Sequence, residues 1–247
     1  MPPGRVLVIL CTYNERGNLV NLIPEIHSFL PQAEVVVVDD NSPDGTGQVA
    51  DEMSQKDPRI HAMHRPGKLG LGTATLAGLQ FAIDHDFDYV INMDADFSHH
   101  PRYLPALLYL MYSADVSIGS RYIRGGGAAG WGLHRRLMSR GINTYARWLL
   151  WLSTQDNSGS FRCYRVAKLR ELDLGKFVAR GYAFQEEILY RCRRVGCRFI
   201  ETPIQFEDRR YGTTKINRAE AVAALIVLFR LGLENLMGVP VVSSRQQ

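Results

Sequence analysis

The sequence lacks any long apolar run and has few cysteines. No stretch approaches the roughly 18 consecutive apolar residues that a transmembrane helix requires, so we expect a protein that does not span a bilayer. The four cysteines form no CxxC pair, which excludes a zinc site of the usual spacing and indicates reduced thiols rather than a disulfide framework. The N-terminus carries no recognisable secretion signal. Together these absences predict a cytoplasmic protein.

Acidic residues are absent between Asp115 and Asp156, a segment that holds six arginines and all three tryptophans of the chain. An anionic membrane surface favours this combination, because arginine meets the headgroups while the indole ring lies at the interface. Nucleic acid is the alternative partner for a basic segment, but no nucleic-acid-binding motif accompanies it, so we expect none. A solvated basic face with tryptophans in the core is the remaining interpretation. The residues are Arg121, Arg124, Arg135, Arg136, Arg140, Arg147, Trp131, Trp148 and Trp151.

Short apolar strands alternate with helices along the first half of the chain, and this pattern predicts an α/β fold. Because the strands are apolar throughout, we expect a Rossmann-like, mostly parallel central sheet with helices on both faces. The predicted strands are 5–10, 34–38, 60–64, 89–93 and 116–118, and the predicted helices are 18–30, 44–54, 70–84 and 103–111.

The second half of the chain has a different character. Its glycine-rich start predicts a mobile loop, and it contains two amphipathic helical segments near the C-terminus. The predicted elements are a loop at 125–132, a basic helix or helix pair at 134–152, a helix at 181–192, a strand at 198–203, a charged loop at 207–215 and a helix at 219–233. We expect one domain at 1–235, with a nucleotide-binding half at about 1–122, an acceptor- and membrane-facing half at about 123–235, and a tail at 236–247.

Polar side chains follow several predicted strands at their carboxyl ends, where ligands bind in parallel sheets. Asp94 and Asp96 close the strand 89–93, and carboxylates spaced i, i+2 at a bend can both reach one Mg²⁺ or Mn²⁺ shared with substrate phosphates. For this pair alone a solvated acidic turn is the commoner explanation. Asp40 follows another strand, as an acid that binds a base or ribose would, and Arg121 offers a planar fork that matches phosphate oxygens. The four residues together indicate a site for a metal and a nucleotide diphosphate.

Other candidates are weaker when taken singly. Tyr13 and Glu15 follow the first strand, where they could frame a base, and Arg209 and Lys215 are candidate phosphate clamps. The glycine-rich turn at 65–72 resembles an anion-binding loop, but it matches neither the P-loop pattern nor the dinucleotide fingerprint. A flexible turn explains it equally well.

Eight stretches, in their order along the chain, resemble the inverting family 2 glycosyltransferases, which have the GT-A fold, and among them the dolichol-phosphate (polyprenol-phosphate) mannosyltransferases. The most specific are Asp-Ala-Asp-x-Ser-His-His-Pro at 94–101 and Asp-Arg-x-Tyr-Gly-x-x-Lys at 208–215. The others lie at 12–16, 38–46, 69–74, 119–122, 158–162 and 181–185, and the resemblance covers roughly residues 5–235. The chain departs from the family at Cys11, where proline is usual, and at Ser98, where some relatives have glutamine.

The resemblance implies transfer of mannose from GDP-mannose to a polyprenyl (dolichyl) phosphate with inversion, and Mg²⁺ or Mn²⁺ as cofactor. Asp96 and Arg121 would be the catalytic residues. The implied guanosine contacts are Tyr13, Glu15, Val38 and Asp40; the implied metal and diphosphate ligands are Asp94, Ala95 and Asp96; the implied phosphate clamps are Arg121, Arg209 and Lys215.

The acceptor must be taken from a membrane, so we expect peripheral attachment to its cytoplasmic face, with a membrane-anchoring protein as a further partner. The residues expected at the acceptor phosphate or the membrane are Arg121, Arg135, Arg136, Trp131, Trp148 and Trp151. The alternatives are the same fold with UDP-glucose or a saccharide acceptor, and a non-catalytic binding subunit. A nucleotidyltransferase is disfavoured, because Thr-Tyr-Asn-Glu stands where its phosphate loop would be.

Overall fold

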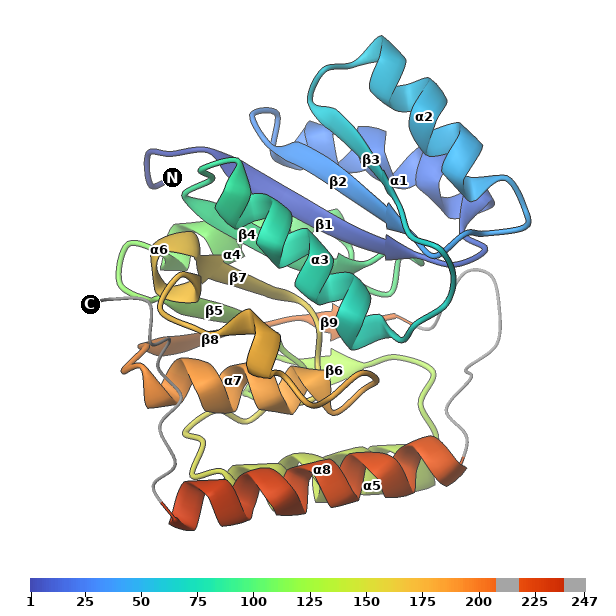
Figure 1. The fold of residues 1–247 in the computed structure, drawn as a ribbon. Helices are drawn as coiled ribbons and strands as arrows, with labels where there is room; N and C mark the ends of the chain where they lie inside the picture. The colour runs from blue at the N-terminus through green and yellow to red at the C-terminus, as the bar shows by residue number, and fades with distance from the viewer. Residues whose placement is uncertain (208–217, 238–247) are drawn as a thin grey trace.

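A seven-stranded, mostly parallel sheet forms the centre of the protein (Figure 1). The structure is a computed structural model that describes residues 1–207 and 218–237. The strands lie in the order β3-β2-β1-β4-β7-β5-β8, and every pairing is parallel except those of β7. Their bounds are β1 Val6–Thr12, β2 Glu34–Asp39, β3 Ile60–His64, β4 Tyr89–Asp94, β5 Val116–Ser120, β7 Arg162–Arg165 and β8 Phe199–Pro203. The predicted α/β fold with a mostly parallel sheet is confirmed.

Helices cover both faces of this sheet, because its central strands are apolar on both sides. On β1, Val6, Val8 and Leu10 pack into one core with α1 and α4, whereas Leu7 and Ile9 pack into the other with α3 and α7. Strand side chains alternate between faces, so a continuous apolar run supplies both cores. The helices are α1 Arg16–Phe29, α2 Thr46–Lys56, α3 Leu71–Asp84, α4 Leu104–Leu110, α6 Val166–Leu169 and α7 Phe184–Arg194, with 3-10 turns at Pro101–Tyr103 and Leu174–Lys176.

Strand β7 was not among the predicted elements. It lies between β4 and β5 and runs antiparallel to both. The sequence of β7, Arg-Cys-Tyr-Arg, is too polar to be recognised as a core strand. Arg162 is nevertheless fully buried, because its guanidinium donates hydrogen bonds of 2.6 Å to the carbonyls of Asn157 and Gln185. Buried charge is tolerated when it is hydrogen-bonded in this way.

The predicted loop at 125–132 contains a short strand. Residues Gly127–Ala128 form β6, which pairs in parallel with β9, Gln205–Phe206. The backbone N–H of Gly127 donates to the carbonyl of Ile204, and that of Ala129 donates to the carbonyl of Phe206. The prediction of a loop throughout this segment is therefore wrong, because its backbone groups are held by the chain that follows β8.

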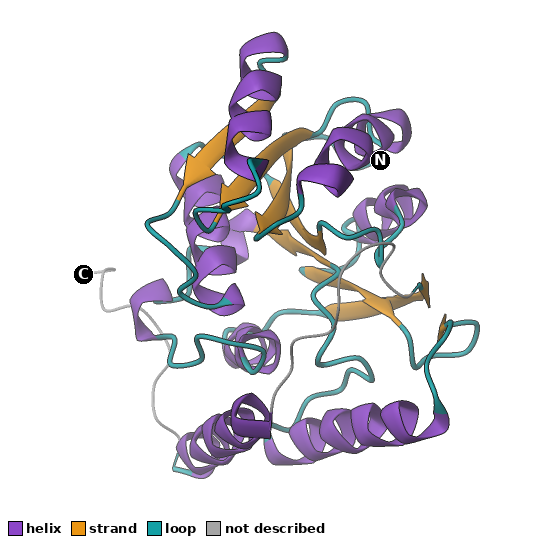
Figure 2. Cartoon of the chain, turned by 90° about the vertical axis from the view of Figure 1, so that its right-hand side faces the viewer, coloured by secondary structure: helices purple, strands orange, loops and turns teal. Residues whose placement is uncertain are grey.

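Two long helices, α5 (Leu133–Leu149) and α8 (Arg218–Leu236), lie side by side along the edge of the molecule below α7 (Figures 1 and 2). α5 is a single helix rather than a pair. Gly232 allows the close approach, because a Cβ atom there would stand 2.5 Å from the side chain of Leu149. Within the described residues, no helix is long and apolar enough to cross a membrane.

Candidate active site

The ends of β1 and β2 bring the predicted nucleoside contacts together. The backbone N–H of Asp40 donates to the carbonyl of Thr12, which joins the two strand ends. Arg65 places its Nη1 atom 2.8 Å from Oδ1 of Asp40, and the two side chains are only 9% and 7% exposed. Burial raises the pKa of Asp40, and the nearby charge of Arg65 opposes this effect. Asp40 is therefore held in place by Arg65, the first residue of the glycine-rich turn.

Tyr13, Glu15 and Val38 lie at the same edge of the sheet. Val38 is buried in β2, and Glu15 precedes the first turn of α1, where its carboxylate accepts a hydrogen bond of 2.7 Å from Asn18. The Nζ atom of Lys68 lies 4.9 Å from the ring centroid of Tyr13. An aromatic face beside carboxylates can stack on a heterocyclic base and accept hydrogen bonds from it.

Asp94 and Asp96 occupy the turn that follows β4. Asp94 accepts a 2.7 Å hydrogen bond from the Ser160 hydroxyl, and its own backbone N–H donates to Nδ1 of His99 at 3.1 Å. Burial lowers the pKa of His99, so the ring is neutral and Nδ1 can accept. Asp96 accepts two hydrogen bonds at Oδ1 from the backbone N–H and hydroxyl of Ser98. The two carboxylates are thus oriented by separate partners.

The donor set of this turn fits a hard divalent cation. The described residues contain no group of three or more His, Cys, Asp or Glu side chains placed to hold a metal by themselves. A site with only two carboxylates suits Mg²⁺ or Mn²⁺, which commonly complete their coordination with substrate phosphates and water. It does not suit a structural zinc ion, which takes four protein ligands, usually sulfur and nitrogen. Ala95, between the two aspartates, is buried.

Arg121 follows β5 and forms a buried ion pair with Asp156. Its Nε and Nη2 atoms donate to the two Asp156 oxygens at 2.7 Å each, and its backbone N–H donates to the same carboxylate at 2.9 Å. Burial alone would lower the pKa of Arg121, but the Asp156 charge outweighs it and raises the pKa. The same pairing lowers the pKa of Asp156 despite its burial. Arg121 is therefore a permanently charged, rigidly held group.

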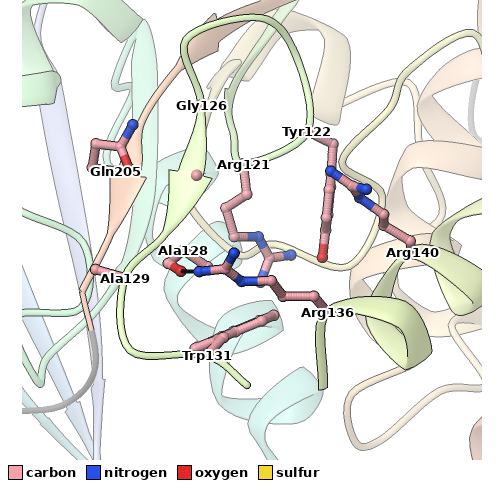
Figure 3. A pocket seen from close by; sticks show the side chains of 10 residues that line it. Arg121, Tyr122, Gly126, Ala128, Ala129, Trp131, Arg136, Arg140 and Gln205 are labelled. Atoms are coloured by element: carbon pink, nitrogen blue, oxygen red, sulfur yellow. Dashed lines mark hydrogen bonds between the residues drawn. The ribbon is translucent and has the colours of Figure 1, made fainter. Parts of the chain in front are cut away.

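A cavity of about 260 Å³ opens beside Arg121 (Figure 3). Arg136 and Arg140 line it from α5, and Tyr122 and Trp131 form part of its wall. Arg136 is held by a 3.1 Å hydrogen bond from Nη2 to the carbonyl of Ala128. Three guanidinium groups around one small cavity have the chemistry that suits an anion such as phosphate.

The tryptophans predicted at the acceptor phosphate or the membrane differ in their exposure to solvent. Trp131 is only 8% exposed and packs under Arg135, whose guanidinium lies 4.1 Å from a Trp131 ring. Trp131 thus belongs to the cavity wall. Docking on a membrane requires an exposed side chain, and Trp131 is not exposed. Trp148 and Trp151 are 74% and 60% exposed. Arg209 and Lys215 lie outside the described residues.

The cavity and the Asp94 turn adjoin one another through aromatic side chains. The His99 ring lies 5.4 Å from the Phe206 ring, and the Arg121 guanidinium lies 5.6 Å from the same Phe206 ring. A carboxylate pair suited to a metal–diphosphate and a basic cavity suited to a second phosphate therefore share one edge of the sheet.

Several residues of this site were missed by sequence reasoning. In the sequence, Asp156 only marks the end of the segment without acidic residues, and Arg140 is only one of its arginines. Ser160 lay within a family-like stretch but had no role assigned. Asp156 and Ser160 act through Arg121 and Asp94, which are distant in the sequence, and Arg140 reaches the cavity through the packing of α5, so no local pattern identifies them.

Comparison with known proteins gives a family match and close curated relatives. Residues 7–173 match the family profile described as Glycosyl transferase family 2. The chain is 40% identical over 234 residues to the polyprenol monophosphomannose synthase of Mycolicibacterium smegmatis, covering 94% of this chain and 88% of that protein. It is 39% identical over 229 residues to the undecaprenyl-phosphate mannosyltransferase of Micrococcus luteus, covering 93% and 94%.

Among solved structures, the chain resembles glucosyl-3-phosphoglycerate synthase from Mycobacterium tuberculosis in complex with Mn²⁺, UDP-glucose and phosphoglyceric acid. The TM-score is 0.66 at 17% identity, covering 96% of this chain and 81% of that one. At this identity the likeness concerns the fold, which is the GT-A glycosyltransferase fold. The sequence matches go further: the chain belongs to glycosyl transferase family 2 and is a glycosyltransferase.

Proposed function

We propose that this protein transfers mannose from GDP-mannose to a polyprenyl phosphate. The observation that carries the proposal is the basic cavity of Arg121, Arg136 and Arg140 next to the Asp94 and Asp96 turn. One site would hold the donor diphosphate and the other a second phosphate, which fits an acceptor that is itself a phosphate. The two mannosyltransferase relatives, named for polyprenol and undecaprenyl-phosphate, support the same choice of acceptor.

The proposed chemistry requires positioning more than proton transfer. A phosphate monoester has a second pKa of about 6 and is an anionic nucleophile near neutral pH, so no strong general base is needed. Arg121, held rigidly by Asp156, would orient the acceptor phosphate beside the anomeric carbon. In-line attack opposite the leaving GDP would invert that carbon and give a β-linked mannosyl phospholipid.

Asp94 and Asp96 would hold Mg²⁺ or Mn²⁺ with the donor diphosphate. When bound, the metal would supply electrostatic stabilisation of the leaving diphosphate. The chain's own contribution is orientation, because Ser160 and Ser98 fix the two carboxylates through hydrogen bonds. Structures of the glucosyl-3-phosphoglycerate synthase contain Mn²⁺ or Mg²⁺ with UDP, which supports the kind of cofactor.

The nucleoside would lie at the ends of β1 and β2, over Tyr13 and beside Glu15, Val38 and Asp40. Guanine is our proposed base. Arg209 and Lys215 are proposed phosphate ligands on the family resemblance alone. The half at about 1–122 would hold the donor, and the half at about 123–235 would face the acceptor and the membrane.

Helices α5 and α8 carry the surface that we propose docks on an anionic membrane. Large apolar side chains are exposed on both, and on α8 they recur at the i, i+4 spacing of one helix face. Arginines accompany them on α5, as expected where headgroups are anionic. This docking surface comprises Leu133, Leu137, Met138, Trp148, Leu225, Phe229 and Leu233 on the two helices and Trp151 just after α5, with Arg135, Arg136, Arg140 and Arg147. It would place the protein on the cytoplasmic face, and a membrane-anchoring protein could share it.

Replacing Trp148 by alanine should weaken binding to vesicles that contain anionic lipid. Burial of a large apolar side chain contributes about 1.5–3 kcal/mol, so we expect roughly tenfold or greater loss of affinity. Vesicle co-sedimentation measures it. Tyr109→Ala is the matched control, because Tyr109 is also an exposed aromatic (64%) but lies on α4. Equal losses of affinity in both variants, or no loss in Trp148→Ala, would contradict the proposed docking surface.

The proposed function is tested by a donor screen with a short-chain, water-soluble polyprenyl phosphate. Turnover of GDP-mannose is the expected result. Turnover of UDP-glucose with none of GDP-mannose would contradict the donor, and transfer only to saccharides would contradict the acceptor.

A further inference from the structure

Two adjacent side chains at the start of α7 are buried without hydrogen-bond partners in the described structure. Gln185 is 2% exposed, and neither its Oε1 nor its Nε2 atom has a partner. Glu186 is 4% exposed, and its Oε2 atom also has none. A buried polar atom without a partner costs about 1–3 kcal/mol. Three such atoms on neighbouring residues are therefore a feature that folding alone does not explain.

The start of α7 lies between the donor and acceptor regions. On the acceptor side, the carbonyl of Gln185 accepts from Arg162, and Glu186 is within electrostatic reach of Arg121 and Asp156. On the donor side, the backbone N–H of Gly72, in the glycine-rich turn, donates to the carbonyl of Arg180 at 2.9 Å. Residues 180–186 thus connect the glycine-rich turn with the Arg121–Asp156 pair.

This segment is also tied to the Asp94 turn. Ser160, which donates to Asp94, precedes Arg162 by two residues on the chain that enters β7, and Arg162 holds the Gln185 carbonyl. The low exposure of Gln185 and Glu186 is compatible with a place in the site, because Asp96 in the same site is also only 4% exposed.

We propose that Gln185 and Glu186 bind the hydroxyl groups of the sugar being transferred. This inference rests on the proposed function, in which that sugar stands between the diphosphate at Asp94 and Asp96 and the acceptor phosphate at Arg121. A hexose offers hydroxyls that both donate and accept, and a carboxamide and a carboxyl group can each form hydrogen bonds with such a hydroxyl. Burial raises the pKa of Glu186 to about 7, so near neutral pH this group is available both as acceptor and as donor.

Such a pair would determine sugar specificity. Sites whose buried polar groups hydrogen-bond a substrate hydroxyl reject analogues that leave those groups unpaired, by several orders of magnitude in kcat/KM. A change in the orientation of one hydroxyl should be discriminated by the same mechanism. We therefore expect Gln185 and Glu186 to distinguish mannose from its epimer glucose on the same nucleotide.

The test uses Gln185→Met, which keeps the length of the side chain and removes both hydrogen-bonding groups. Because Gln185 has no side-chain partner in the described structure, replacing it with an apolar group of similar shape should leave the melting temperature unchanged or raise it. The ratio of kcat/KM for GDP-mannose over GDP-glucose should fall by about 100-fold or more, while the affinity for GDP alone should not change. Gln80→Met, on the exposed surface of α3, is the matched control.

A second variant, Glu186→Gln, should lower the same ratio and also leave GDP binding intact. The proposal is overturned if both variants keep the mannose-to-glucose ratio, or if GDP affinity and melting temperature fall together with activity, as a purely structural role requires. Should the wild-type protein use another nucleotide-sugar, the proposed function fails. The specificity test is then made with that donor and its epimer, so the two failures are distinguishable.

Discussion

Asp96→Ala should lower kcat/KM by about 10³-fold, because the donor diphosphate would lose the carboxylate that we propose holds its metal. Removing a single preorganised electrostatic contact typically costs 10²–10³ in rate, and a lost metal contact belongs at the upper end of that range. Excess Mg²⁺ or Mn²⁺ should not restore the rate. Steady-state transfer of mannose to a soluble polyprenyl phosphate measures the effect.

A companion variant separates this chemical role from folding. Asp96→Asn keeps an oxygen that can accept from Ser98 but loses the charge, so it should melt near the wild-type temperature and remain inactive. Asp84→Ala, at the exposed end of α3, should be fully active. If Asp96→Ala retains transferase activity, the metal site does not lie at this turn.

Arg121→Ala should damage both stability and activity. Asp156 is fully buried, and removing its partner would leave an unpaired charge in the core. Breaking such a pair costs about 3–5 kcal/mol, so the free energy of unfolding should fall by that amount. Denaturant titration measures it. Activity should fall by about 10³-fold as the acceptor phosphate loses its most rigid ligand.

The double variant Arg121→Ala/Asp156→Asn distinguishes the two effects. Asp156 accepts from the backbone N–H of Arg121 at one oxygen and from that of Gly159 at the other, and an asparagine would keep one of these two acceptors without the unpaired charge. We expect it to regain about half of the lost stability and none of the activity. Arg124→Ala, on the exposed part of the same loop, is the control. Recovery of activity together with stability would mean that Arg121 has only a structural role.

Strands such as 34–38 were predictable because parallel strands buried on both faces are apolar throughout. The positions of Asp40, Asp94 and Arg121 followed from the same logic, since the carboxyl ends of these strands meet at one edge. Their placement required no knowledge of the loops, only that each residue follows a buried strand.

The remaining features depend on contacts that the sequence does not display. β7 contains two arginines, and Arg162 can be buried only because distant carbonyls accept its hydrogen bonds. The sequence places Trp131 among the residues expected at the acceptor phosphate or the membrane, but Arg135 and Phe206 pack against it in the cavity wall. The partner of Arg121 lies 35 residues away, at Asp156. Such pairings follow from tertiary structure, which periodicity and spacing do not specify.

The central claim is that a lipid phosphate attacks mannose carried on GDP. Its most direct test is product analysis after the purified protein is incubated with GDP-mannose, Mg²⁺ and a short-chain polyprenyl phosphate. Mass spectrometry and NMR should identify GDP and a mannosyl phosphate with a β-linked anomeric carbon. A product with the α configuration, or no transfer from GDP-mannose under conditions in which UDP-glucose is consumed, would contradict the account.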